Sequence, residues 1–206
     1  MEENALIRDR DYTLLIDKSQ SMSTQDQAGG KSRWEVAQES TYALAKQCEE
    51  YDPDGITVYV FSSRFKRYDN VKSDQVSKVY AENDPMGKTD LLAALEDAIE
   101  NYFQRKAAGE TKPNGETLLI ITDGEPEDRK GVIRYIIETS RRLDRDDELG
   151  ISFIQVGDDP KVTEYLKALD DQLLDTGAKF DIVDTITMTE MGNSSLPDVL
   201  LKAITD

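Results

Sequence analysis

The ten residues YTLLIDKSQS (12–21) decide the fold and include the first candidate site. Their first half is a short apolar run, typical of a strand that is buried on both faces of a parallel sheet. Their second half places one carboxylate and two hydroxyls at alternate positions, on Asp17, Ser19 and Ser21. Where an extended chain begins to turn, three such oxygens can converge on one point. Serines at a strand end also commonly hydrogen-bond the local backbone, so this short pattern alone leaves both roles open.

Similar apolar runs recur along the chain and alternate with segments of helical periodicity. We expect strands over residues 12–16, 56–61, 117–122 and 151–156, a weaker strand over 180–186 and a short polar edge strand over 64–68. Apolar stripes with helical spacing lie within 34–48, 91–103 and 132–143, and a last helix is expected over 196–204. This alternation predicts an α/β fold: a doubly wound, mostly parallel six-stranded sheet with helices on both faces and one short antiparallel edge strand.

No repeat, low-complexity tract or interdomain linker interrupts this pattern. We therefore expect residues 1–206 to form a single domain with its core at about 11–205.

A second carboxylate is expected beside Asp17. The strand over 117–122 leads directly into Asp123 and Gly124. In a sheet that grows outward from its first strand and then continues on the other side of it, the strands over 12–16 and 117–122 are neighbours at the reversal point. Ligands bind in the crevice at that point. The topology therefore predicts that Asp17 and Asp123 face one crevice.

A third segment, MGKTD (86–90), precedes the helix that carries the second apolar stripe. Its glycine gives the backbone freedom to bring Thr89 toward the same crevice. Capping of the following helix is the other role open to Thr89 or Asp90, and the two roles are compatible.

Together, Asp17-x-Ser19-x-Ser21, Thr89 and Asp123-Gly124 resemble the metal-ion-dependent adhesion site (MIDAS) of von Willebrand factor A domains. The resemblance covers the chain from about Tyr12 to the last expected helix. It implies that the hydroxyls of Ser19, Ser21 and Thr89 bind a cation directly, while Asp17 and Asp123 act mainly through water. The implied cation is Mg²⁺, or Mn²⁺ or Ca²⁺, and the implied partner is a protein that presents an Asp or Glu; no catalysis is implied.

Two positions depart from the family pattern: Gln20 and Lys88 stand where glycines are common. Neither is a ligand position, but Lys18 and Lys88 add cations close to the expected site. The segment around Glu125–Asp128 resembles that of intracellular bacterial members of the family. That resemblance implies a partner such as an AAA-type ATPase or a stress-response complex.

Composition narrows the function classes further. The chain has 25 Lys and Arg against 42 Asp and Glu, a formal charge of -17, which disfavours nucleic acid as a partner. It has no histidine and one cysteine, Cys48, so the expected metal site uses oxygen ligands and no intrachain disulfide can form. The first residues do not resemble a secretion signal, and no stretch approaches the roughly 20 apolar residues that span a bilayer. We therefore expect a cytoplasmic protein that does not enter a membrane.

Two other readings of the crevice stay open. A Mg²⁺-dependent phosphoryl-transfer enzyme could use Asp17 as nucleophile or metal ligand, although the crevice offers only Lys18 or Lys88 to hold a phosphate. A nucleotide-binding Rossmann domain is compatible with the architecture, but the glycine-rich turn that it needs after the first strand is missing.

Overall fold

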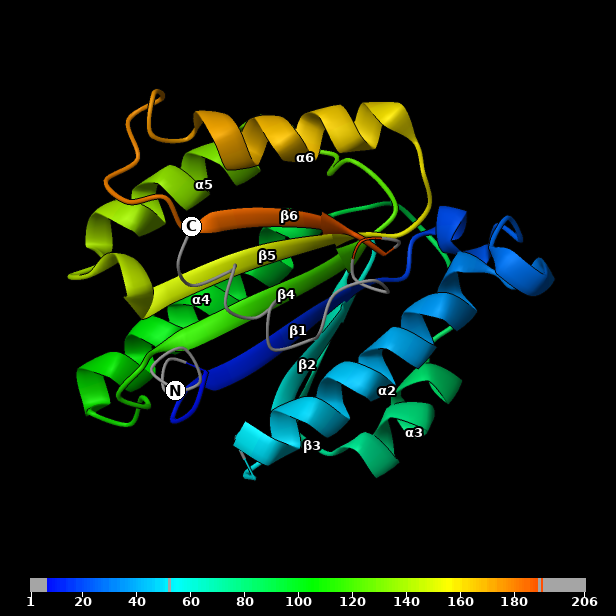
Figure 1. Cartoon of the computed structure of the whole chain (residues 1–206), viewed down its shortest axis with the longest axis horizontal. Coiled ribbons are helices and arrows are strands. Elements are labelled where there is room, and N and C mark those ends of the chain that lie inside the picture. The colour runs from blue at the N-terminus through cyan, green and yellow to red at the C-terminus, as the bar shows by residue number, and fades with distance from the viewer. Residues whose placement is uncertain (1–6, 52, 189, 191–206) are drawn as a thin grey trace.

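The computed structural model describes residues 7–51, 53–188 and 190, and its centre is one six-stranded sheet (Figure 1). The strands lie in the order β3-β2-β1-β4-β5-β6. Each pair of neighbours is parallel except β2 and β3, which are antiparallel. The strand bounds are β1 Asp11–Asp17, β2 Ile56–Phe61, β3 Phe65–Val71, β4 Glu116–Thr122, β5 Leu149–Gln155 and β6 Val183–Thr187. The predicted fold class is confirmed, including the antiparallel edge strand.

Helices cover both faces of this sheet. Helices α2 and α3 pack on one face, and α4, α5 and α6 pack on the other (Figure 1). The α-helices are α2 Arg33–Tyr51, α3 Val76–Ala81, α4 Leu91–Ala108, α5 Arg129–Arg142 and α6 Pro160–Gln172. Single 3-10 turns are η1 Gln20–Ser23, η2 Ala28–Gly30, η3 Ser73–Gln75 and η4 Asp146–Glu148.

The central strands are buried on both sides because their apolar side chains alternate between two cores. In β1, Leu14 and Ile16 belong to the core under α2, whereas Leu15 belongs to the core under α4. Each such buried side chain contributes about 1.5–3 kcal/mol relative to exposure. The lone cysteine, Cys48, is fully buried in the first core, as its place on an apolar helical face predicts.

Helices α3 and α6 were not among the predicted elements. Helix α6 had a readable signal: Asp159 accepts a hydrogen bond from the backbone N–H of Lys161, Pro160 begins the helix, and Val162, Leu166 and Leu169 form its buried stripe. The edge strand β3 is also longer than predicted. The helix expected over 196–204 lies outside the described residues, and the single-domain assignment stays a prediction.

Among the residues described, no helix has the length and apolar character needed to cross a membrane.

Candidate metal site

The carboxyl ends of the two central strands bring the predicted ligands to one edge of the sheet. Residue Asp17 is the last residue of β1, and Asp123 directly follows β4. Because β1 and β4 pair in parallel with Ile16 opposite Ile121, both carboxylates emerge at the reversal point of the strand order.

Asp17 forms the buried floor of the site. Its Oδ1 accepts a hydrogen bond from the Ser19 backbone N–H at 2.7 Å, and its Oδ2 accepts one from the Thr122 hydroxyl at 2.7 Å. The side chain is fully buried, and burial raises the pKa of its carboxyl from 3.8 to about 6. Hydrogen bonds from the Ser19 backbone, the Thr122 hydroxyl and the Ser19 side chain lower the pKa, whereas the nearby charge of Asp123 adds to the increase.

Above this floor, a chain of hydroxyls connects the β1 end to Asp123. The Ser21 hydroxyl donates to Asp123 Oδ1 at 2.8 Å, and the hydroxyl oxygens of Ser19 and Ser21 lie 3.0 Å apart. Ser19 is almost fully buried, whereas Ser21 is exposed. A hydroxyl oxygen has two lone pairs, and these contacts use at most one of them on each serine, so both oxygens can bind a further ligand.

Spacing between these oxygens suits a small divalent ion. In an octahedral Mg²⁺ site with metal–oxygen distances of about 2.1 Å, neighbouring ligand oxygens lie about 3.0 Å apart. The separations from Ser19 Oγ to Ser21 Oγ and from Ser21 Oγ to Asp123 Oδ1 are 3.0 and 2.8 Å. These are ordinary hydrogen-bond distances, and they are also the spacing of adjacent corners of such an octahedron.

Thr89 reaches the same edge from the loop before α4. A Cβ added to Gly124 would lie 3.6 Å from the Thr89 hydroxyl oxygen, so this hydroxyl lies beside the segment that carries Asp123. The Thr89 carbonyl also accepts from the Glu127 backbone N–H at 3.0 Å. Asp90 is the N-cap of α4 but its side chain makes no capping hydrogen bond. Capping therefore does not occupy the Asp90 side chain.

Arg33 is a part of the site that the sequence analysis missed. Its guanidinium donates to Asp123 Oδ2 at 2.8 Å and also forms an ion pair with Asp26 in the loop over residues 22–31. Hydrogen bonds to Asp26 and Asp123 raise the pKa of the guanidinium, so it stays charged. An arginine in the first turn of a helix opposes the helix dipole. An arginine at this unfavourable position was the signal in the sequence that it pairs with a specific acidic side chain.

The candidate metal ligands carry little negative charge. Within the described part of the chain, no group of three or more His, Cys, Asp or Glu side chains is arranged to hold a metal. The candidate site instead combines two carboxylates with three hydroxyls, and Arg33 already offsets part of the charge of Asp123. An ion held mainly by neutral oxygens keeps most of its charge and favours a further anionic ligand. The residues fit Mg²⁺ or Mn²⁺, and metal binding by them stays a prediction.

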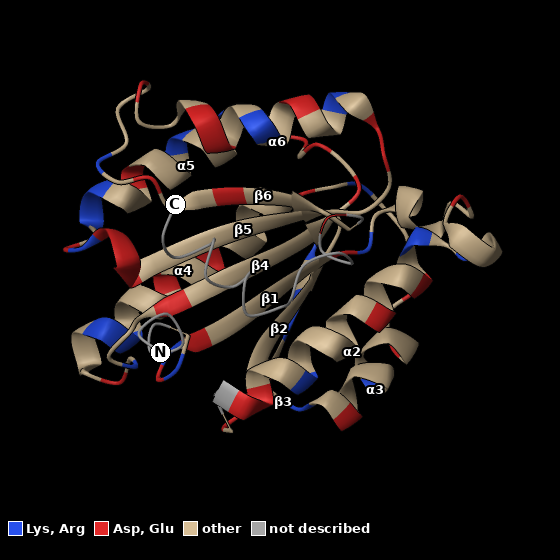
Figure 2. Ribbon diagram, in the orientation of Figure 1, with Lys and Arg blue, Asp and Glu red and all other residues tan. Residues whose placement is uncertain are grey.

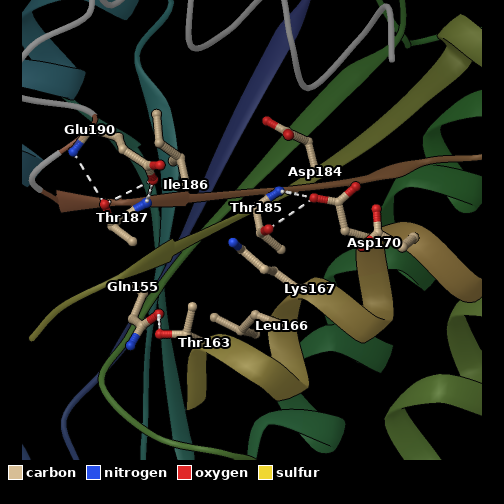
Figure 3. A pocket seen from close by; sticks show the side chains of 11 residues that line it. Gln155, Thr163, Leu166, Lys167, Asp170, Asp184, Thr185, Ile186, Thr187 and Glu190 are labelled. Carbon is tan, nitrogen blue, oxygen red and sulfur yellow. Dashed lines mark hydrogen bonds between the residues drawn. The ribbon is translucent and has the colours of Figure 1, made fainter. Parts of the chain in front are cut away.

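Another hollow, of about 380 Å³, lies between α6 and the edge strand β6 (Figure 3). Its polar side chains hydrogen-bond one another: Asp170 accepts from Thr185 at 2.8 Å, and Gln155 accepts from Thr163 at 2.9 Å. The predicted metal ligands are not among the residues that line it. We assign it no part in the site.

Comparison with known proteins shows the family of the chain. The profile of the von Willebrand factor type A domain matches residues 12–125. Among solved structures, the chain is similar to a variant of the PilB minor pilin from Streptococcus sanguinis, with a TM-score of 0.59 and 12% identity over 95% of this chain. It spans 59% of that pilin chain. A search of curated proteins found no match.

A second similar structure is the pilus adhesin RrgA from Streptococcus pneumoniae, with a TM-score of 0.41 and 15% identity. The alignment covers 56% of this chain and 20% of the adhesin chain. At 12% identity, the similarity to the pilin shows a shared fold alone. The TM-score of the adhesin is too low to support a conclusion.

Proposed function

The chain belongs to the von Willebrand factor type A domain family, and from that membership we propose that it is a metal-dependent protein-binding module. It binds one divalent cation at the carboxyl edge of the sheet and uses the cation to bind a carboxylate of a partner protein. The proposed metal ligands, direct or through water, are Asp17, Ser19, Ser21, Thr89 and Asp123.

The observation that carries this proposal is the hydroxyl chain from Ser19 through Ser21 to Asp123. It has the oxygen spacing of a Mg²⁺ site and opens to solvent at Ser21. When bound, the ion supplies an electrophilic centre, and a partner's Asp or Glu is the anionic ligand that the protein does not provide. Oxygen ligands without histidine or cysteine favour Mg²⁺, Mn²⁺ or Ca²⁺ over Zn²⁺.

Phosphoryl transfer by Asp17 is less consistent with the same geometry. A nucleophile needs a free oxygen within reach of its substrate. Asp17 is fully buried, and both of its oxygens accept hydrogen bonds from Ser19 and Thr122. We therefore propose that the domain is a binding module and not an enzyme, and expect no hydrolysis of p-nitrophenyl phosphate with Mg²⁺.

The proposed partner is a protein, for which the family resemblance suggests an AAA-type ATPase or a stress-response complex. We expect the immobilised chain to capture this partner from a lysate of its source organism in Mg²⁺ and to release it in EDTA. Replacing one acidic residue of the partner by its amide removes the anionic oxygen at nearly constant size. Binding should then fall to the EDTA level.

The double variant Ser19→Ala/Ser21→Ala should lose this capture, whereas Ser77→Ala, an exposed serine on α3, should retain it. Capture that is insensitive to EDTA, to the serine double variant and to every acid-to-amide change would contradict the proposal.

A further inference from the structure

A hollow of about 440 Å³ opens beside the candidate metal site, at the end of β2. We call it the β2–β3 hollow, because the turn between these strands forms part of its wall. Its lining includes Lys18, Val60, Arg64, Lys66, Met86 and Gly87. Its volume is within the range of about 300–1,000 Å³ that is typical of ligand sites, so one large side chain can enter it.

The hollow and the metal site share a wall. The Met86 backbone N–H donates to the Lys18 carbonyl at 2.7 Å, and the Gln20 backbone N–H donates to the Gly87 carbonyl at 3.1 Å. These bonds join the loop that lines the hollow to the segment that carries Ser19. A ligand bound between the serine hydroxyls therefore lies within a few residues of the hollow, since an extended chain advances about 3.3 Å per residue.

Apolar surface is exposed at this place. In the part of the chain that the structure describes, the exposed large hydrophobic side chains are Tyr42, Phe65, Met86 and Leu174. Two of them, Phe65 and Met86, line the β2–β3 hollow. The ring of Phe65 packs on Tyr59 at a centroid distance of 5.7 Å, so Met86, which is 57% exposed, provides the freer apolar surface. Such surface beside a binding site is typical of an interaction surface.

The rim of the hollow is basic although the chain is strongly acidic. Lys18, Arg64 and Lys66 lie along it, in a chain with a formal charge of -17. Lys66 pairs with Glu82 at 2.8 Å, but among the described residues neither Lys18 nor Arg64 forms an ion pair. Acidic residues are instead spread over the helices on both faces of the sheet (Figure 2). The rim therefore complements a negatively charged segment.

We propose that the β2–β3 hollow binds a large apolar side chain from an acidic segment of the partner, within three residues of the Asp or Glu that binds the metal. This proposal rests on the proposed function, because the metal-bound carboxylate positions the segment. The hollow then selects among the many exposed carboxylates that a metal alone would accept.

Fluorescent peptides test the proposal without knowledge of the partner. The reference peptide carries a central Glu in a background of Gly and Ser. The others add one Phe at each of the three positions before or after the Glu. In Mg²⁺, at least one Phe peptide should bind about 10-fold more tightly than the reference, because part of an aromatic side chain leaves water.

The variant Met86→Gln should remove this gain and leave the affinity of the reference peptide unchanged. The matched control Leu174→Gln changes a side chain that is 53% exposed and does not line the hollow, so the gain should persist. Separately, Arg64→Gln should weaken binding more for peptides rich in Asp than for the same peptides with Ser.

The outcomes separate the two proposals. Suppose that the reference peptide binds only with Mg²⁺. If no Phe peptide then binds more than twofold more tightly, or if Met86→Gln retains the gain, the proposal for the hollow is overturned and the metal site stands. A Phe gain that persists in EDTA and is lost in Met86→Gln supports the hollow and contradicts the metal-dependent function. No binding of any peptide in Mg²⁺ contradicts both.

Discussion

Replacing Asp17 by Asn should stabilise the metal-free protein and weaken Mg²⁺ binding, two effects of opposite sign from one change. The buried carboxyl of Asp17 has a pKa of about 6 instead of 3.8, so at pH 7 its ionised form costs about 2–3 kcal/mol of folding free energy. An amide carries no such cost. Its oxygen can still accept from Ser19, while the Thr122 hydroxyl turns to donate to the Gly124 carbonyl at 3.1 Å.

The sign of the pH dependence identifies the cause. A carboxyl whose pKa is higher in the folded protein binds its proton more tightly there. Its favourable contribution to the free energy of unfolding is therefore present below about pH 4 and is lost as the pH rises through about 6. In EDTA, the stability of Asp17→Asn relative to wild type should therefore grow from near zero at pH 4 to about 2–3 kcal/mol at pH 7. Urea unfolding across this range measures it.

The effect on metal affinity should be a loss of about 100-fold, the upper end of what removing an outer ligand partner causes. Calorimetric titration with Mg²⁺ measures this loss. If Asp17→Asn is less stable than wild type in EDTA at pH 7, Asp17 is a structural hydrogen-bond centre and the account of the site floor is wrong.

Replacing Gly115 by Ala should destabilise the fold by about 3–5 kcal/mol, because the added methyl group meets backbone and not a movable side chain. Gly115 has a φ of 81°, and its new Cβ would lie 1.9 Å from the Glu148 carbonyl oxygen. The carbonyl of Gly115 also accepts from the Asp11 backbone N–H at 2.9 Å, so the turn connects the starts of β1, β4 and β5.

A control separates the collision from the unfavourable φ alone. Gly109, at the end of α4, has a φ of 73°, and a Cβ added there meets nothing within 4 Å. The cost of Gly109→Ala should be about 1–2 kcal/mol. Thermal unfolding of both variants provides the comparison, and equal losses would show that the close approach to Glu148 does not constrain the fold.

The fold was predictable because apolar runs and helical stripes alternate clearly along the chain. The strand order followed from chain topology, and with it the meeting of Asp17 and Asp123 at one edge. The polar strand β3 was placed but its length was not, since an exposed edge strand carries no apolar pattern that marks its end. Helix α6 was overlooked although its cap and buried stripe were readable.

The site was less predictable, because side-chain partners depend on geometry across the fold. The order of Asp17, Ser19, Ser21, Thr89 and Asp123 predicted a shared edge of the sheet, and the structure places Ser21 against Asp123 there. It did not indicate that Asp17 would be fully buried with both oxygens bonded, or that Arg33 would pair with Asp123. Such contacts join residues up to about a hundred positions apart, and only the packed structure brings them together.

The most direct test of the central claim is anomalous diffraction from crystals of this chain soaked in Mn²⁺. We expect a chain with a charge of -17 to bind divalent ions weakly at many surface carboxylates, so the position of the ion matters more than its presence. We predict that the strongest anomalous peak lies about 2.1–2.3 Å from the hydroxyl oxygens of both Ser19 and Ser21. If crystals at saturating Mn²⁺ show anomalous peaks only at other carboxylates and none between these two serines, the account is contradicted.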